Sequence, residues 1–172
     1  MNRNKGFTLI ELIVVIAIIG VLAGVLLIAI NPAALLAKGR DAKRLDDLDS
    51  LNKAISLSLA DGEIALSDAA EPGGTQAVDG TNGWVRYTLP TGKTGLSKYI
   101  STLPQDPSND AATGLVYSYA SRDGLPAANG AAGYELNAVL ESPDNTTKMS
   151  TDGGNDPARY EVGTILNLIT PN

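Results

Sequence analysis

The stretch GFTLIELIVVIAIIGVLAGVLLIAI, residues 6–30, is apolar almost throughout, and the rest of the chain is organised around it. Its one charged residue is Glu11, and from Leu12 to Ile30 there is no charge at all. A run of this length predicts a helix that crosses the hydrocarbon core of a membrane. A secretory signal peptide has its cleavage site after the apolar run, but here the run continues through the small residues that could mimic such a site.

The carboxylate near the start of this run needs a partner. On insertion scales an acidic residue costs about 2.5–3.5 kcal/mol at mid-membrane, and less near an interface. No basic residue lies within a helical turn of Glu11, because Arg3 and Lys5 precede the apolar run. A buried carboxylate without a partner is unfavourable. We therefore expect its counter-ion to come from elsewhere.

Composition excludes several classes of function. The chain has 172 residues, enough for one small domain beside the apolar helix, and contains neither cysteine nor histidine. Disulfides, thiol nucleophiles, thiolate metal sites and Ser-His-Asp triads are thereby excluded. The net charge of −6 and the 5% aromatic content do not favour nucleic-acid binding. We expect neither an enzyme nor a specific nucleic-acid partner.

A second, amphipathic helix is predicted for residues 31–61. Apolar side chains recur three or four positions apart from Leu45 onward, and Asp61-Gly62 is typical of a helix end. The charged residues of this helix, Asp41 and Arg44 included, are expected to occupy the other positions, away from the apolar face. If helical throughout, residues 7–61 form one rod of roughly 80 Å, at about 1.5 Å per residue.

Three residues are expected to act as helix breakers: Gly20, Gly24 and Pro32. Pro32 removes one backbone hydrogen bond and disfavours helical geometry at the residue before it, so a kink is expected there. Gly20 and Gly24 form a G-x-x-x-G pair, which is typical of close helix packing. Local melting of the helix is the alternative role, and the sequence leaves both open.

Residues 62–172 are predicted to form a β-rich head, which makes the fold α+β. After a long connection over residues 63–83, a short helix is expected at 96–102. Alternating or β-branched and aromatic runs predict three or four short antiparallel strands, at residues 84–89, 115–119, 134–140 and 160–166.

The segment Gly6-Phe7-Thr8-Leu9-Ile10-Glu11, with its apolar tail, resembles the processing and assembly signature of type IV pilins and type II secretion pseudopilins. The resemblance implies that a prepilin peptidase removes a leader peptide, residues 1–6, by cutting between Gly6 and Phe7. It also implies that Phe7 becomes N-methylphenylalanine. Residues 7–30 would then form a transmembrane and assembly helix, and the fold would be the pilin fold.

The resemblance further implies a structural role in a filament that is a polymer of the chain itself. The subunit would sit as a single-pass protein in the inner membrane, then enter an extracellular or periplasmic filament through an inner-membrane assembly platform. Membrane lipid would be its partner before assembly. The orientation rests on the resemblance, because Lys and Arg residues flank the apolar run on both sides.

In this family the new amino group at Phe7 is the obvious cation for Glu11. The two residues are at i,i+4 spacing, so a pair within one chain is possible. A pair between staggered subunits would instead set the axial register of a filament. We favour the intermolecular pair, on the weight of the resemblance.

Two other functions remain as alternatives. The first is the major pseudopilin of a type II secretion system, because Leu103-Pro104-Gln105-Asp106-Pro107, followed by Tyr117 and Tyr119, resembles the variable domain of that subunit. The second is a membrane-tethered extracellular binding domain, which would not polymerise.

A calcium site is a weak expectation for a glycine-rich acidic loop near the C-terminus. The resemblance to pseudopilins implies calcium in a late loop, and oxygen ligands suit that ion. The candidates are Asp152, Asn155 and Asp156, with Asp144 nearby in the sequence. Their spacing matches no EF-hand loop, so a solvated turn without any cofactor is the favoured interpretation.

Overall fold

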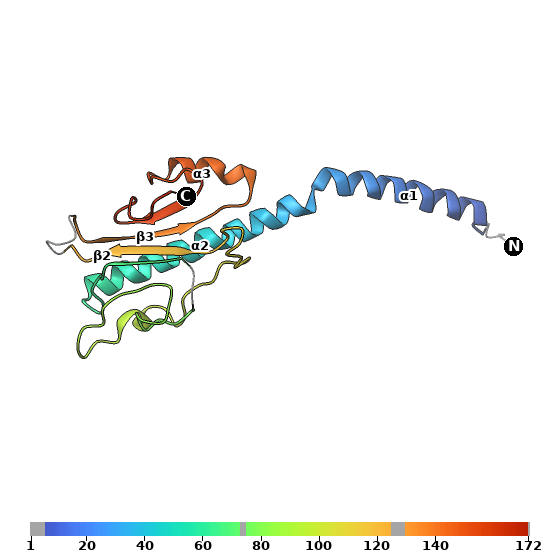
Figure 1. Cartoon of the computed structure of the whole chain (residues 1–172). Coiled ribbons are helices and arrows are strands. Elements are labelled where there is room, and N and C mark those ends of the chain that lie inside the picture. The colour runs from blue at the N-terminus through green and yellow to red at the C-terminus, as the bar shows by residue number, and fades with distance from the viewer. Residues whose placement is uncertain (1–5, 73–74, 125–129, 172) are drawn as a thin grey trace. The chain divides into compact units, whose positions relative to one another are not determined.

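The computed structural model describes residues 6–72, 75–124 and 130–171 of the chain. It divides into two compact units, residues 1–37 and 38–172, which are described separately below. Figure 1 shows the whole chain, coloured from the N-terminus to the C-terminus.

The first unit is built on helix α1, Leu9–Ile30, which runs through Gly20 and Gly24 without a break. Asn31 interrupts the helix, because its backbone lies in the left-handed region at φ 45° and ψ 78°. Its side-chain oxygen accepts a hydrogen bond from the backbone N–H of Ala34 at 3.3 Å. Pro32 is the first residue of the next helix, where its missing N–H costs nothing.

Helix α2, Pro32–Ala60, continues into the second unit and supplies the spine of the head. Gly62 follows it with φ 62°, the left-handed conformation that commonly ends helices. The expected stop signal at Asp61-Gly62 is thus confirmed.

An open antiparallel sheet packs against α2. Its strands are β1 (Ala69–Pro72), β2 (Ser118–Arg122), β3 (Gly133–Ala138) and β4 (Tyr160–Gly163), in the order β1-β2-β3-β4. Two 3₁₀ turns, Gly95–Lys98 and Pro143–Asn145, and a short helix α3, Thr146–Thr151, lie in the connections. Figure 1 shows β2 and β3 running alongside α2. The expected α+β pilin-like layout is confirmed.

The hydrophobic core lies between α2 and the sheet. Leu48, Leu51 and Ile55 of α2 are fully buried there, as is Leu136 of β3. The long connection before β2 completes the core with Trp84, whose indole N–H donates to the carbonyl of Pro104 at 2.9 Å. One face of α2 and one face of the sheet thus share a single core.

Several predicted elements are shifted or wrong. Residues 84–89 do not form a strand: Trp84, Val85 and Tyr87 are buried as loop residues, and Thr88 makes only an isolated bridge with Ala65. The edge strand β1 lies instead inside the predicted connection, residues 63–83. The second predicted strand begins three residues later than expected, at Ser118, and the predicted helix over 96–102 is only the 3₁₀ turn Gly95–Lys98. The alternating apolar pattern of residues 84–89 indicated buried side chains, but side chains of a loop can be buried as well.

Truncation of a core leucine tests the packing of α2. Leu51→Ala removes a side chain with 0% exposure, and Leu57→Ala removes one of similar size that is 53% exposed. The buried truncation is expected to lower the free energy of unfolding by about 2–5 kcal/mol, since it leaves a cavity. The exposed truncation should cost far less. Denaturant unfolding of the full chain in detergent measures both, and equal losses would contradict the assignment of the core face.

Candidate functional site

The start of α1 is fixed by a reciprocal pair of hydrogen bonds between Thr8 and Glu11. The Thr8 hydroxyl accepts from the backbone N–H of Glu11 at 3.3 Å and donates to its Oε2 at 2.7 Å. The backbone N–H of Thr8 donates to the same Oε2 at 2.8 Å. This is a capping box, in which side chains satisfy backbone donors that a helix start leaves free. Glu11 therefore has a local, uncharged partner.

Sequence reasoning on Glu11 considered only cations and missed this partner. The signal was present, because Thr8-Leu9-Ile10-Glu11 has the Thr-x-x-Glu spacing that is typical of a capping box before an apolar run. The hydrogen bonds satisfy the carboxylate but leave its charge in place. The partial positive charge of a helix N-terminus offsets part of that charge.

The surface of α1 is apolar on every side. The segment Leu9–Leu27 is long and apolar enough to cross a membrane, and its side chains have no cover from the described residues of the chain. A Cβ atom added at Gly20 or at Gly24 would meet nothing within 4 Å. Such a surface needs either lipid or other apolar helices around it.

The residues expected at the processing site are accessible. Gly6 is exposed, and the Phe7 side chain is 87% exposed immediately before the capping box. Residues 1–5, the remainder of the expected leader peptide, lie outside the described residues.

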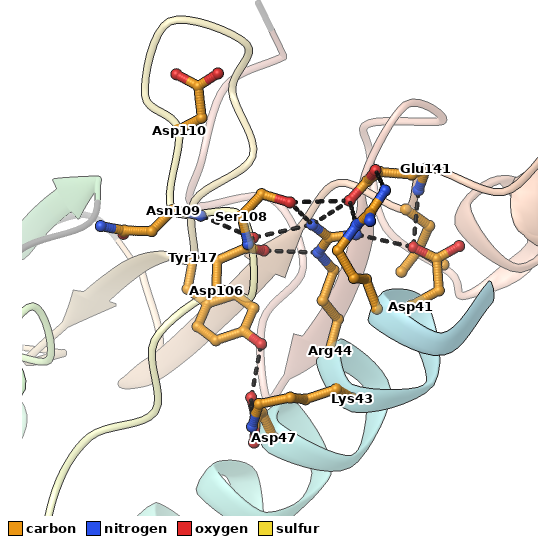
Figure 2. A network of polar contacts seen from close by, with 12 residues as sticks. Asp41, Lys43, Arg44, Asp47, Asp106, Ser108, Asn109, Asp110, Tyr117 and Glu141 are labelled. Carbon is orange, nitrogen blue, oxygen red and sulfur yellow. Dashed lines mark hydrogen bonds and ion pairs between the residues drawn. The ribbon is translucent and has the colours of Figure 1, made fainter. Parts of the chain in front are cut away.

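The second group of polar residues is the Arg44 cluster, which consists of Arg44, Asp41, Asp106 and Glu141 (Figure 2). The Arg44 guanidinium has 0% exposure and makes two hydrogen bonds to the Asp106 carboxylate, at 2.6 and 2.9 Å. It also lies 3.0 Å from Oδ1 of Asp41 and 2.5 Å from Oε1 of Glu141. One buried cation thus joins α2 to two separate connections of the head.

Asp41 completes the attachment of α2 to the segment after β3. Its carboxylate accepts hydrogen bonds from the backbone N–H groups of Glu141 and Ser142, both at 2.8 Å, and from the Asn145 amide at 2.8 Å. Asp41 has 0% exposure, so these bonds replace its lost hydration. The fully buried carboxylate has a donor at both oxygens.

The electrostatics of the Arg44 cluster favour its charged form. Burial alone would lower the pKa of Arg44, but the hydrogen bonds with Asp106 and Glu141 outweigh it and raise the pKa above the ordinary value. The hydrogen bond from Arg40 lowers the pKa of Glu141 to about 2, against the effect of burial, and Arg44 adds to the lowering. Glu141 therefore contributes stability above its unfolded pKa, and this is lost as the pH falls toward 2.

The expectation that Asp41 and Arg44 lie away from the buried face of α2 is wrong. Arg44 lies four residues before Leu48, and Asp41 three before Arg44, so both extend the buried stripe of α2. The helical spacing could have placed them on that face. Their charge argued for solvent, and the sequence did not reveal that Asp106 and Glu141, from distant connections, would meet them there.

The calcium candidates are held by protein groups. Asp152 accepts from the N–H groups of Gly154 and Glu161, at 3.0 and 2.7 Å, and Asp156 accepts from the N–H of Ala158 at 2.9 Å. The Asn155 amide donates to the carbonyl of Ile169 at 3.3 Å. Asp144 pairs with Lys38 at 2.5 Å. Within residues 6–72, 75–124 and 130–171, no group of three Asp, Glu, His or Cys side chains is arranged to hold a metal ion.

Comparison with known proteins identifies the N-terminal segment. Residues 1–27 match the family described as the prokaryotic N-terminal methylation motif. The chain is also similar to Fimbrial protein Q of Moraxella bovis, at 36% identity over 86 residues. The chain is thus similar to fimbrial proteins and carries a prepilin-type methylation motif. The similarity covers 47% of this chain and 54% of the relative, so it spans about half of the fimbrial protein it matches. No solved structure matches the chain.

In this pilin-like chain, removal of the Arg44 cation tests the Arg44 cluster. Arg44→Met retains volume but leaves the buried carboxylates of Asp41 and Asp106 without their counter-ion. We expect the free energy of unfolding to fall by about 3–5 kcal/mol, the usual cost of breaking a buried ion pair from one side. Lys53→Met is the control, because it removes an exposed cation from a surface pair with Asp49 on the same helix.

Denaturant unfolding of the full chain in detergent at neutral pH measures both variants. Lys53→Met should unfold at the same denaturant concentration as the unsubstituted chain, since surface pairs contribute little. If Arg44→Met were as stable as Lys53→Met, the Arg44 cluster would not be what joins α2 to the two connections.

Proposed function

We propose that this chain is a structural subunit of a type IV pilus-like filament, processed after Gly6 and polymerised through α1. The observation that carries the proposal is the exposure of α1: an apolar helix without cover, headed by one acidic residue in a capping box. The methylation motif and the fimbrial relative support it. The role is structural rather than enzymatic.

Burial of α1 supplies the driving force for polymerisation. Removal of apolar surface from water contributes roughly 25 cal/mol per Å². In the bilayer, lipid tails satisfy the same surface, so single subunits can be stored there. Outside the bilayer, the α1 helices of other copies are the matching cover. The contacts would be head-to-tail and heterologous, which generate helical filaments when the rotation does not close.

The charge of Glu11 gives the proposed polymer its register. In the uncleaved chain the nitrogen of Phe7 is a peptide amide, and Glu11 is satisfied by Thr8. Cleavage after Gly6 would create an amino group one residue before the capping box. We propose that this cation pairs with Glu11 of the neighbouring subunit, because the capping box satisfies hydrogen bonds without neutralising the carboxylate. Pairing inside an apolar bundle is strong since little water screens it.

The partners follow from this proposal. A prepilin peptidase would cut and methylate the chain, and an inner-membrane assembly platform would extract it from the membrane. The subunit would be a single-pass protein of the inner membrane before assembly. A pilus subunit would then be found on sheared surface filaments, whereas the major pseudopilin of a secretion system would remain in the periplasm.

Substitution of Gly6 tests the assigned cleavage site. Gly6→Leu places a branched side chain on the residue before the cut and is expected to leave the leader uncleaved. Gly39→Ala is the matched control, because a Cβ at that exposed glycine of α2 meets nothing within 4 Å. Mass spectrometry of protein from a pilus-forming host should find methylated Phe7 at the start of the unsubstituted and Gly39→Ala chains. A first residue of Met1, or a cut beyond Ala17, would mean that the site is wrong.

A four-variant series separates the two roles of Glu11. Glu11→Gln keeps the shape of the capping box and removes the charge, whereas Glu11→Ala removes both. Thr8→Val keeps the charge and the backbone donor but removes the hydroxyl that caps the helix and donates to Glu11, at a cost to the helix start of about 1 kcal/mol. We expect both Glu11 variants to insert and be cleaved but to yield at most a tenth of the normal filaments, with Thr8→Val close to normal. Leu9→Val is the control for a side-chain change in the same turn.

Filament yield is measured by electron microscopy and by immunoblot of sheared material and of membranes. Normal filaments from Glu11→Gln, together with few from Thr8→Val, would show that Glu11 acts only as a helix cap. Filaments absent from the surface but present in the periplasm would favour the secretion pseudopilus.

A further inference from the structure

The face of the sheet opposite α2 carries a row of buried polar side chains. Leu136 faces the core, so its neighbours Glu135 and Asn137 face the other way, and Glu161 of β4 lies directly opposite Asn137 in the antiparallel register. Glu135 and Asn137 have 0% exposure and Glu161 has 2%. Carboxylates are almost never buried to this degree without a partner.

The carboxyl groups of Glu135 and Glu161, called here the acid pair, belong to diagonal neighbours on one face of adjacent strands, within reach of each other. Each uses its Oε2 to hold a segment that covers this face. Oε2 of Glu135 accepts from the N–H groups of Leu168 and Ile169, at 2.6 and 3.1 Å, and Oε2 of Glu161 accepts from that of Asp156 at 2.9 Å. Oε1 of each acid is buried and accepts no hydrogen bond from the described protein groups. The side-chain nitrogen and oxygen of Asn137 are also buried without a hydrogen-bond partner among them.

The charged groups that face the acid pair do not neutralise it. Asp152, at the end of α3, and Asp156, in the loop before β4, add negative charge on that side. Two cations lie on this side of the head: Lys148 of α3 lines the same cavity as Glu161, and Arg159 lies 3.4 Å from Asp156 and 3.4 Å from the hydroxyl of Ser118. Residues 164–171, which cover Glu135, contain no charged side chain. Arg159 forms its ion pair with Asp156 and not with either acid.

Two ionised carboxylates are unfavourable as buried neighbours, because their repulsion is strong where water is excluded. We propose that Glu135 and Glu161 share one proton between their free oxygens, and that this proton holds the sheet and its two covering segments together. Asn137 lies beside the acid pair, where its amide can donate to the ionised acid and accept from the protonated one. The inference is independent of the proposed function in a filament.

A shared proton makes the stability of the head depend on pH near neutrality. Burial, with the Glu135 carboxyl acting in the same direction, raises the pKa of Glu161 from an ordinary 4.5 to about 7. The folded state therefore binds this proton more tightly than the unfolded state does. Its contribution is fully present below pH 4.5 and is lost as the pH rises through 7. Loss of the proton leaves two like charges beneath the segments at residues 152–156 and 165–169.

The test compares the full chain with Glu161→Gln, in detergent and in buffer treated with EDTA. Gln keeps the shape and donates permanently to Glu135, so this variant should not respond to pH between 5 and 8. Relative to it, the folded-to-unfolded ratio of the unsubstituted chain should fall on the order of 10²-fold over that range. Asp46→Asn, which removes an exposed carboxylate from α2, is the control and should follow the unsubstituted chain.

Infrared spectroscopy detects the proton directly and does not depend on how the variant folds. At pH 6 a protonated carboxyl should give a C=O band that disappears by pH 8.5. The measurement is repeated in the Glu11→Gln chain, since Glu11 lies in the apolar segment and could contribute such a band. Identical pH profiles for the unsubstituted chain and Glu161→Gln, or no band at pH 6 in the Glu11→Gln chain, would overturn the proposal. So would stabilisation by added calcium at pH 6 without the band, which would assign a metal ion to the acid pair.

Discussion

The constraint on which the molecule depends is the apolar surface of α1. Between Leu9 and Leu27 the helix has bulky aliphatic side chains on every side, and no described part of the chain covers them. Water is an unfavourable environment for such a surface, so the helix requires lipid or other apolar helices around it. Its one ionisable side chain is placed in the first turn, where Thr8 and the helix N-terminus make a carboxylate tolerable. In the proposed function, membrane storage and assembly would thus use the same surface.

In the head, a small sheet is attached to α2, a helix that is mostly polar. Apolar contacts from Leu48, Leu51 and Ile55 supply one part of the attachment. The Arg44 cluster supplies the other, by burying charges that belong to α2 and to two connections far away in the sequence. A buried ion cluster is not a strong source of net stability, but it is costly to break from one side. It therefore favours one arrangement of the connections over others.

Much of this could be predicted from sequence, and the failures have a common physical cause. Length and hydropathy predicted α1, the helical spacing predicted α2, and the prepilin-like segment predicted the α+β layout. The loop at Trp84 was mistaken for a strand because burial, and not strand geometry, imposes its apolar pattern. Arg44 and the acid pair were missed since burial of charge depends on partners that only the fold brings together. The capping box of Thr8 and Glu11 is different, because it is local and could have been found from spacing alone.

The central claim is that Glu11 of one subunit pairs with the terminal amine of another. Solid-state NMR on filaments grown from a mixture of two batches tests it most directly. One batch carries ¹⁵N only at Phe7 and the other carries ¹³C only in the glutamate carboxyl groups. Transfer of magnetisation between the amine nitrogen and the Glu11 carboxyl carbon is predicted in the mixed filaments, where the labels are never on the same chain. A second preparation, in which every chain carries both labels, is the comparison. Transfer in this second preparation alone, or in neither of the two, would contradict the intermolecular pair.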